Sequence, residues 1–355
     1  LTVRCSNQLS YQGRNPSFKG SAKVESLSTP TSWRAFSTFA RSKNCSHMQL
    51  VTVGTVAFDN IETPFGKAEK VVGGAATYIS LAASFFVKEQ GIVSVVGEDF
   101  PTEMMEKMRK RGIDLAGLEI LKGKESFFWS GKYHYDMNTR DTLETRLNVL
   151  LELDPELNDA YKATEYLMLG NLDPKVQAKV LDQVSAPALV VLDTMNFWMD
   201  SSMDELKEVI KRVDILTIND SEARQWSGEH SLVKAAHVIL GMGTKYLGVK
   251  KGEHGALLFN KKNVFVAPAL PLDEVVDPTG AGDTFAGGFI GYLARSGDHS
   301  FNNLKRAIIV GSTMASFCCE KFGVERLLEL TQEEIDLRIQ QFVDLVDFDI
   351  QVVEG

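Results

Sequence analysis

Short apolar, β-branched runs alternate with amphipathic stretches from Gln49 onward, and this alternation constrains the fold more than any other feature of the sequence. Short apolar runs bounded by turn residues are typical of buried strands, and the stretches between them have helical spacing. Strands that are connected through helices pair in parallel. The pattern therefore predicts a doubly wound α/β sheet with helices on both faces.

The expected elements follow one another in the order that such a sheet requires. The strand candidates are Leu50–Val56, Ile92–Val96, Tyr166–Gly170, Leu189–Asp193, Ile215–Ile218 and Tyr246–Val249. The helix candidates include Ala75–Lys88, Thr102–Arg111, Pro174–Val184, Met203–Lys211, Leu232–Leu240, Thr284–Arg295 and Asn302–Cys319. No internal repeat is present.

One region departs from the alternation. Residues 119–135 form a long aromatic stretch that alternates in polarity and is not followed by a helical pattern. Its aromatic residues are Phe127, Phe128, Trp129, Tyr133 and Tyr135. Together with residues 61–72 this stretch is expected to form a small extra sheet, which would serve as a lid over a substrate. An ordinary edge hairpin is the alternative.

The first 47 residues differ in composition from the rest of the chain. They are rich in Ser and Arg, and they carry seven basic residues against a single acidic one. This composition is typical of an organelle transit peptide, although translated upstream sequence before Met48 explains it equally well. We expect residues 1–47 to be a disordered, non-catalytic tail and residues 48–350 to form one domain. The expected location is cytoplasmic, or organellar if the tail is a transit peptide.

Composition also bears on the kinds of partner. The net charge of −9 gives no broad positive field that would attract nucleic acid. The longest apolar runs, such as Ile79–Val87, are far shorter than a bilayer-spanning helix, so a membrane role is not expected. The four cysteines (Cys5, Cys45, Cys318 and Cys319) lack the spacing of a disulfide framework or a metal site, and we expect the last two to be core residues.

Residues Thr279–Asp283 read Thr-Gly-Ala-Gly-Asp and form a turn of small residues that runs directly into an expected helix. We call this segment the glycine turn. Glycines let backbone N–H groups converge, and a helix N-terminus adds partial positive charge, so the turn suits an anion such as a phosphoryl group in transfer. A carboxylate at Asp283 would repel that anion unless it has another task, such as accepting the proton of an attacking hydroxyl. The alternative is that Asp283 caps the helix and the glycines only pack tightly.

Other phosphate-binding and hydrolytic motifs are absent from the sequence. It contains no Gly-x-x-x-x-Gly-Lys-Ser/Thr, no Gly-x-Gly-x-x-Gly after a strand, no Gly-x-Ser-x-Gly and no His-Glu-x-x-His. P-loop enzymes, Rossmann dehydrogenases, α/β hydrolases and zincins are therefore disfavoured.

Residues 277–289 read Asp-Pro-Thr-Gly-Ala-Gly-Asp-Thr-Phe-Ala-Gly-Gly-Phe, which resembles the C-terminal signature of the PfkB/ribokinase family of carbohydrate kinases over its whole length. The order of elements across about residues 50–345 resembles that family as well. The resemblance implies a ribokinase-like, doubly wound, mostly parallel sheet flanked by helices, with a small β lid. It also implies ATP-dependent phosphorylation of an alcohol.

The same resemblance implies roles for the residues of this turn. Asp283 would be the general base, and the N–H groups of Gly280, Ala281 and Gly282 would form the anion hole. Asp277 would help to bind a monovalent cation, with K⁺ as the candidate. A turn-initiating aspartate before a proline is the alternative for Asp277 and needs no ion.

A second motif, Asn219-Asp-Ser-Glu222, follows an expected strand and resembles the family's Asn-x-x-Glu element. The resemblance implies that Glu222 orients water around Mg²⁺ and that Asn219 lies near the phosphates of ATP. Mg²⁺ holds its water tightly, so such indirect coordination is typical of it. The alternative is a capped helix start with Asp220 as the N-cap.

Lys250-Lys-Gly-Glu-His-Gly255 resembles the strand–turn–strand that cradles the nucleotide in this family. Lys250, Gly252 and Gly255 are therefore expected at ATP, as is Thr279 at the start of the glycine turn. A hairpin turn without a ligand is the alternative, and His254 is expected to be a turn residue.

On the substrate side, Asp59 stands where the family binds sugar hydroxyls, and Val72-Gly-Gly-Ala-Ala-Thr77 resembles its Gly-Gly substrate motif. A carboxylate accepts two hydrogen bonds from a vicinal diol. Asp59, Gly73, Gly74 and Thr77 are therefore the substrate candidates, with a surface aspartate at a strand end as the alternative for Asp59. The chain departs from the family at one position: where most members have Asn, this chain has Thr77, followed by Tyr78.

The function expected from these residues is ATP- and Mg²⁺-dependent phosphorylation of a small sugar. Asp193 and Asn196, at the end of the expected strand Leu189–Asp193, stand where the family has an Asp-x-Asn element that faces the phosphates or the substrate. The resemblance makes them secondary candidates. A nucleoside kinase of the same fold is the nearest alternative, and an aromatic stacking site within residues 127–135 would distinguish it. An inactive regulatory homologue is the alternative of another class. The expected partner is a small molecule, and a homodimer is compatible with the sequence.

Overall fold

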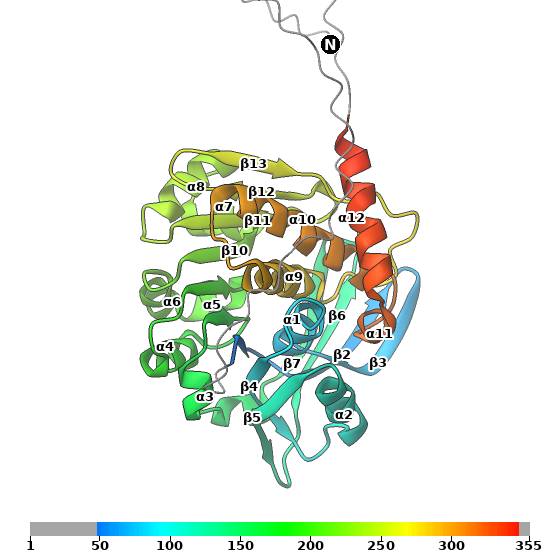
Figure 1. The fold of residues 1–355 in the computed structure, drawn as a ribbon. Helices are drawn as coiled ribbons and strands as arrows, with labels where there is room; N and C mark the ends of the chain where they lie inside the picture. The colour runs from blue at the N-terminus through cyan, green and yellow to red at the C-terminus, as the bar shows by residue number, and fades with distance from the viewer. Residues whose placement is uncertain (1–47, 348–355) are drawn as a thin grey trace, which may run out of the picture. The chain divides into compact units, whose positions relative to one another are not determined.

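A nine-stranded sheet runs through residues 48–347, the part of the chain that the computed structural model describes (Figure 1). From one edge to the other its strands are β13 (Val264–Ala267), β12 (Ala256–Phe259), β11 (Tyr246–Lys250), β10 (Ile215–Asn219), β9 (Leu189–Asp193), β8 (Tyr166–Leu169), β1 (Leu50–Val53), β4 (Gln90–Gly97) and β5 (Ile113–Leu121). All pairs from β11 to β5 are parallel, whereas β12 and β13 are antiparallel. The doubly wound, mostly parallel sheet predicted from the sequence is therefore confirmed.

Helices cover both faces of this sheet (Figure 1). The first face carries η1 (Asn148–Glu152), α3 (Asp159–Lys162), α4 (Pro174–Gln183), α5 (Asn196–Ser201), α6 (Met203–Ile210), α7 (Asp220–Ser227) and α8 (Leu232–Leu240). The second face carries α1 (Ala75–Ala83), α2 (Thr102–Lys110), α9 (Ala281–Ser296), α10 (Phe301–Cys318), α11 (Glu325–Glu329) and α12 (Gln332–Val346).

The central strands are apolar because both of their faces are buried. In β1, Val51 and Val53 pack in the core of the first face, and Leu50 packs in the core of the second, with α1 and α9. Successive side chains of a strand point to opposite faces, so a strand that is covered on both sides loses the polar alternation of a surface strand.

Several expected boundaries move in the structure. The expected strand Leu50–Val56 ends at Val53. The expected helix Ala75–Lys88 ends at Ala83. The start of α9 matters most for function, because this helix begins at Ala281 rather than at Thr284 and so includes Ala281, Gly282 and Asp283 of the glycine turn in its first turn.

A second, four-stranded sheet has the order β3-β2-β6-β7, formed by β3 (Gly66–Gly73), β2 (Ala57–Thr63), β6 (Phe127–Tyr133) and β7 (Arg140–Arg146). We call these four strands the lid sheet. The extra sheet expected from residues 61–72 and 119–135 is thus confirmed, and the edge hairpin is wrong. Residues 119–121 belong instead to β5 of the large sheet, and β7 lies beyond the expected segment.

No helix among residues 48–347 is long and apolar enough to cross a membrane. The expected tail, residues 1–47, and the last three residues of the expected domain, 348–350, lie outside the described residues.

Candidate active site

Three neighbouring parallel strands, β9, β10 and β11, end in polar residues at one edge of the large sheet. These residues are Asp193, Asn219 and Lys250. Helix α9 begins at the same edge, since the Lys250 ammonium lies only 3.2 Å from where a Cβ on Gly282 would stand. Ligands of open α/β sheets bind outside the carboxyl ends of the strands, so this edge is the candidate active site.

Asp277 holds the turn that leads into α9. Its buried carboxylate accepts hydrogen bonds from the N–H groups of Thr279 (2.8 Å) and Gly323 (3.1 Å). Burial raises the pKa of Asp277, and these hydrogen bonds oppose the rise. The bond to Thr279 is the turn-initiating arrangement considered as the alternative for Asp277. Behind the turn, the buried Cys318 thiol donates to the Thr279 carbonyl (3.3 Å).

Gly280 is the N-cap of α9 and adopts a left-handed backbone conformation, with a φ of 76°. A Cβ there would lie 2.4 Å from the ring of Tyr78, so both conformation and space require glycine. The N–H of Ala281 donates to the Pro278 carbonyl (3.1 Å). No acceptor among residues 48–347 takes the N–H groups of Gly280 and Gly282. Two of the three expected anion-hole donors are thus free for a ligand.

Asp283 is half-buried in the first turn of α9, and its carboxylate has no hydrogen-bond or ion-pair partner in the described part of the chain. Burial raises its pKa to about 7; the charge of Asp193 adds to the rise, whereas Lys250 and Arg140 oppose it. A carboxyl group that titrates near neutral pH and has no competing partner suits proton transfer. Because the N-cap is Gly280, the alternative of Asp283 as a helix cap is wrong.

A largely buried ion pair joins Asp193 and Lys250 at the strand ends. The Asp193 carboxylate also accepts a hydrogen bond from the Thr217 hydroxyl (3.0 Å). Burial disfavours the charged ammonium, but the charges of Asp193 and Glu222 outweigh this effect and raise the pKa of Lys250. Lys250 therefore carries its positive charge beside Gly282 of the glycine turn. The other secondary candidate, Asn196, is exposed at the start of α5.

Asn219 and Glu222 form a capping box at the start of α7. The Asn219 side chain accepts from the N–H of Glu222 (2.8 Å), and the Glu222 carboxylate accepts from the N–H of Asn219 (2.8 Å). The expected alternative of a capped helix start is therefore present, but the cap is Asn219, and the assignment of Asp220 as N-cap is wrong. Burial raises the pKa of Glu222 to about 7, and its second carboxylate oxygen has no partner among the described residues.

The expected nucleotide turn is a hairpin in which η2 (Gly252–His254) connects β11 with β12. Gly252 and Gly255 have positive φ values of 54° and 79°, so both favour glycine. A Cβ on Gly255 would lie 2.1 Å from the carbonyl oxygen of Ala267. His254 lies exposed on this turn, so its expected place as a turn residue is confirmed.

Asp59 lies on β2 and is 5% exposed, which excludes the alternative of a surface aspartate. Burial raises its pKa to about 8, and the charges of Asp277 and Asp283 add to the rise. Its carboxylate lies against Gly73, where a Cβ would approach within 1.9 Å of Oδ2. Gly74 has a φ of 90° and is the N-cap of α1. The two glycines thus let the carboxylate and the start of α1 come close together.

Thr77 is fully buried in α1, and its hydroxyl donates to the Gly73 carbonyl (2.7 Å). Its neighbour Tyr78 contacts the glycine turn, as described above. The Tyr78 hydroxyl is buried and has no hydrogen-bond partner within residues 48–347. Burial, together with the nearby Cys318, raises the pKa of this phenol well above its ordinary value. Buried polar groups seldom stay unpaired, so the Tyr78 hydroxyl is one of a few exceptions within residues 48–347.

Three residues of the lid sheet face the same side as Asp59. Trp129 is paired in register with Asp59, and Tyr133 lies four residues further along β6, so both share its face. Tyr133 accepts a hydrogen bond from the Thr279 hydroxyl (3.2 Å), which brings this face against the glycine turn. Arg140 is the register partner of Tyr133 and forms no ion pair among the described residues. No sequence pattern pointed to Arg140, because every residue of β7 is exposed and the strand has no apolar alternation.

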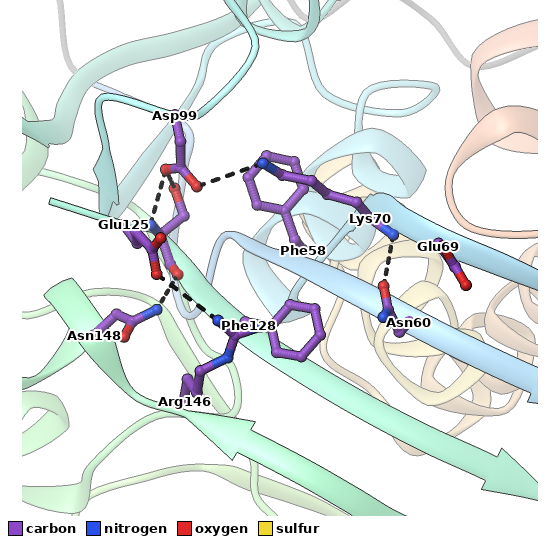
Figure 2. Close-up of a pocket in the computed structure, with 10 residues that line it drawn as sticks. Phe58, Asn60, Glu69, Lys70, Asp99, Glu125, Phe128, Arg146 and Asn148 are labelled. Carbon is purple, nitrogen blue, oxygen red and sulfur yellow. Dashed lines mark hydrogen bonds and ion pairs between the residues drawn. The ribbon is translucent and has the colours of Figure 1, made fainter.

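The opposite face of the lid sheet carries a separate shallow pocket (Figure 2). Phe58 and Phe128 line it, with the Lys70 ammonium 4.8 Å and the Arg146 guanidinium 4.1 Å from the respective ring centres. Phe58 precedes Asp59 in β2 and therefore points away from the active site. This pocket contains none of the candidate catalytic residues.

Comparison with known families decides the class of protein. The family model described as pfkB family carbohydrate kinase matches residues 48–330. The chain belongs to the pfkB family of carbohydrate kinases.

Individual pfkB-family relatives agree with this assignment. The chain is 28% identical to the cytidine kinase of Thermococcus kodakarensis over 78% of its own length and 98% of that protein. The nucleoside kinase of Methanocaldococcus jannaschii, an archaeal member of the ribokinase family, superposes with a TM-score of 0.67 at 23% identity, covering 83% of this chain and 99% of that one. The nucleoside kinase of Burkholderia thailandensis in complex with inosine superposes with a TM-score of 0.67 at 19% identity, covering 83% of this chain and 98% of that one. The fold is thus that of ribokinase-like kinases, and the protein is a phosphotransferase.

Kinases of the pfkB family use ATP and typically Mg²⁺, and the residues of this edge fit both. Among the described residues, no three acidic, histidine or cysteine side chains form a metal-binding group. Mg²⁺ is often held indirectly, through its water and through phosphate oxygens. The free oxygen of Glu222 suits such indirect coordination. Both carboxylate oxygens of Asp277 already accept backbone hydrogen bonds, so the turn is explained without K⁺, and the monovalent cation stays a prediction.

Proposed function

We propose that this protein is a nucleoside kinase that transfers the γ-phosphoryl group of ATP to a sugar hydroxyl of the nucleoside. The observation that carries the proposal is the pairing of Trp129 with Asp59, which puts an aromatic ring and a carboxylate on one face of the lid sheet. A nucleoside offers a diol to the carboxylate and a flat base to the ring. The names of the relatives, cytidine kinase and nucleoside kinase, support the same substrate class.

In the proposed reaction, Asp283 accepts the proton of the attacking hydroxyl. The hydroxyl oxygen forms a bond to the γ-phosphorus as the bond to the β,γ-bridging oxygen breaks, and ADP leaves. A pKa of about 7 allows Asp283 to be ionised before the transfer and to hold the proton after it. Asp59, with Gly73 and Gly74 beside it, holds the sugar in position. Thr77 is also a substrate candidate from the sequence, and it supports Gly73 through its hydrogen bond to the Gly73 carbonyl.

The negative charge of the phosphoryl group meets several positive partners at this edge. The N–H groups of Gly280 and Gly282 face it at the start of α9, and the Lys250 ammonium lies beside them. Arg140 adds an unpaired guanidinium from the lid sheet. Mg²⁺, when bound, neutralises phosphate oxygens, and Glu222 would hold its water. Asn219, Gly252, Gly255 and Thr279 complete the proposed ATP site.

The test is an ADP-release assay with MgATP over pentoses, hexoses, inositols and nucleosides. We expect nucleosides to give the highest kcat/KM, and Trp129→Ala to lose at least tenfold with them while Trp129→Phe keeps most of the activity. A response to free sugars alone would support the small-sugar kinase expected from the sequence. No phosphorylation of any acceptor would support an inactive homologue.

A further inference from the structure

The hairpin that connects β6 with β7 touches both halves of the proposed active site. At one end Tyr133, only 4% exposed, accepts a hydrogen bond from Thr279 in the glycine turn. At the other end the Asn138 amide donates to the Glu253 carboxylate in the nucleotide turn (3.2 Å). These contacts join segments that are 146 and 115 residues apart in the sequence.

The contact at Asn138 is close as well as polar. A Cβ on Gly252 would lie 2.2 Å from Asn138 Oδ1, so the side chain of Asn138 lies directly on the backbone of the nucleotide turn. A side chain at position 252 would therefore force the Asn138 side chain out of this position. Glycine at position 252 thus allows both the close approach of Asn138 and the positive φ of the turn.

Asn138 is held for this contact by its own turn. The Asp136 carboxylate accepts hydrogen bonds from the N–H groups of Asn138 (3.1 Å) and Thr139 (2.9 Å) and from the Thr139 hydroxyl (2.6 Å). The Asn138 amide in addition donates to the Asp136 carbonyl (3.0 Å). The orientation of Asn138 is therefore fixed before it meets Glu253, which lowers the entropic cost of docking.

We propose that the β6–β7 hairpin couples the two substrate sites, with Asn138 and Tyr133 as positioning residues that transmit nucleotide binding to the acceptor lid. A nucleotide that orders the Gly252–Gly255 turn favours the docked position of Asn138. The docked hairpin in turn fixes the strand that carries Trp129 beside Asp59. By linkage, an acceptor bound under the lid tightens nucleotide binding by the same factor. This inference rests on the proposed function for the position of the nucleotide.

Hydrogen exchange with a nonhydrolysable nucleotide alone tests the coupling without any acceptor. We expect Mg²⁺ and the ATP analogue AMP-PCP to slow amide exchange about fivefold in residues 133–141 as well as in residues 250–255. Tyr133→Phe, which removes the acceptor of the Thr279 hydroxyl, should weaken the protection of the hairpin. Tyr135→Phe is the matched control, because Tyr135 is 83% exposed on the same hairpin, and it should behave like the wild type.

Two substitutions at the contact between Asn138 and Glu253 distinguish a loss of hairpin docking from a general loss of stability. Asn138→Asp places a carboxylate against Glu253 and should abolish the protection of the hairpin, while the nucleotide turn stays protected. Combining it with Glu253→Gln restores a donor–acceptor pair with the roles reversed and should recover the protection. Unchanged exchange of the wild-type hairpin on nucleotide addition, or full protection in Asn138→Asp, would overturn the proposal. A protein that protects its hairpin but phosphorylates no acceptor would refute the proposed function and leave the coupling intact.

Discussion

Four buried or half-buried acidic residues, Asp59, Glu222, Asp277 and Asp283, surround the site, and burial raises the pKa of each. Lys250, paired with Asp193, is the buried counter-charge. Carboxyl groups with raised pKa values cluster at functional sites more often than elsewhere in proteins. In the proposed reaction, the free carboxylate of Asp283 is the group that accepts the proton.

Asp283→Asn is expected to lower kcat about 10³-fold, because the amide accepts no proton from the attacking hydroxyl. Removing a carboxylate from an anion site leaves nucleotide binding intact or tightens it. Steady-state kinetics with titration of AMP-PCP tests both statements. A variant that loses nucleotide binding along with kcat would contradict the role of base.

The pH dependence of kcat/KM should show an acidic limb near pH 7, rising as Asp283 ionises. Arg140 lowers the pKa of Asp283, so Arg140→Gln should raise that pKa and move the limb upward by about half a pH unit. The rate on the plateau should fall as well, because the phosphoryl group loses a positive partner.

Arg146→Gln is the matched control for this pH profile. Arg146 lies on the same strand but over Phe128 on the outer face of the lid sheet (Figure 2). Its profile should match that of the wild type. A limb that stays in place in Arg140→Gln would show that Arg140 does not act on Asp283.

Asp59→Asn should stabilise the protein at alkaline pH while it abolishes acceptor phosphorylation. The pKa of Asp59 rises from 3.8 to about 8 on folding, so the folded state binds its proton more tightly. Its contribution to stability is complete below pH 4 and is lost as pH rises towards 8. At pH 8.5 the neutral amide should therefore raise the free energy of unfolding by more than about 1 kcal/mol. Denaturant unfolding at pH 5 and pH 8.5 measures the difference.

At the scale of elements, the two ends of α9 have the same conformation and different surroundings. Gly280 and Gly297 are both left-handed, with φ values of 76° and 65°. Gly280 lies against Tyr78, whereas nothing lies within 4 Å of a Cβ on Gly297. The same substitution at the two ends therefore separates conformational strain from the loss of space.

Gly297→Ala should cost about 1 kcal/mol of stability and leave kcat unchanged. Gly280→Ala should cost more than about 2 kcal/mol, because strain and a clash with Tyr78 add, and should lower kcat at least tenfold as the N–H groups move. Thermal unfolding and kinetics of the two variants test this. Equal effects at both ends would rule out a special role for the Gly280 turn.

The lid sheet shows which strands a sequence pattern can predict. β6 was expected from its aromatic alternation, whereas β7 was missed, because all of its side chains are exposed. An exposed strand has no apolar face and therefore leaves no periodic signal. The strand that carries Arg140 is stabilised by its pairing with β6, not by its own burial.

At the scale of the whole molecule, residues 48–330 match the pfkB family model and residues 48–347 contain the described fold. We expect a protein that begins at Met48 to unfold at the same temperature as the full chain and to keep kcat and both KM values within about twofold of those of the full chain. Calorimetry and the ADP-release assay test this expectation. A tenfold loss of activity would show that residues 1–47 contribute to catalysis.

The reaction class and the fold could be predicted from the sequence, because the signature at residues 277–289 and the alternation of strands and helices are local patterns. Local patterns also located Asp283, Glu222, Lys250 and Asp59. Which groups lie together follows from the tertiary structure: Asp193 pairs with Lys250, Tyr133 with Thr279 and Asn138 with Glu253, and Arg140 lowers the pKa of Asp283. These residues come together through strand order and register in two sheets, and burial at that meeting point sets their pKa values. No short stretch of sequence encodes either property.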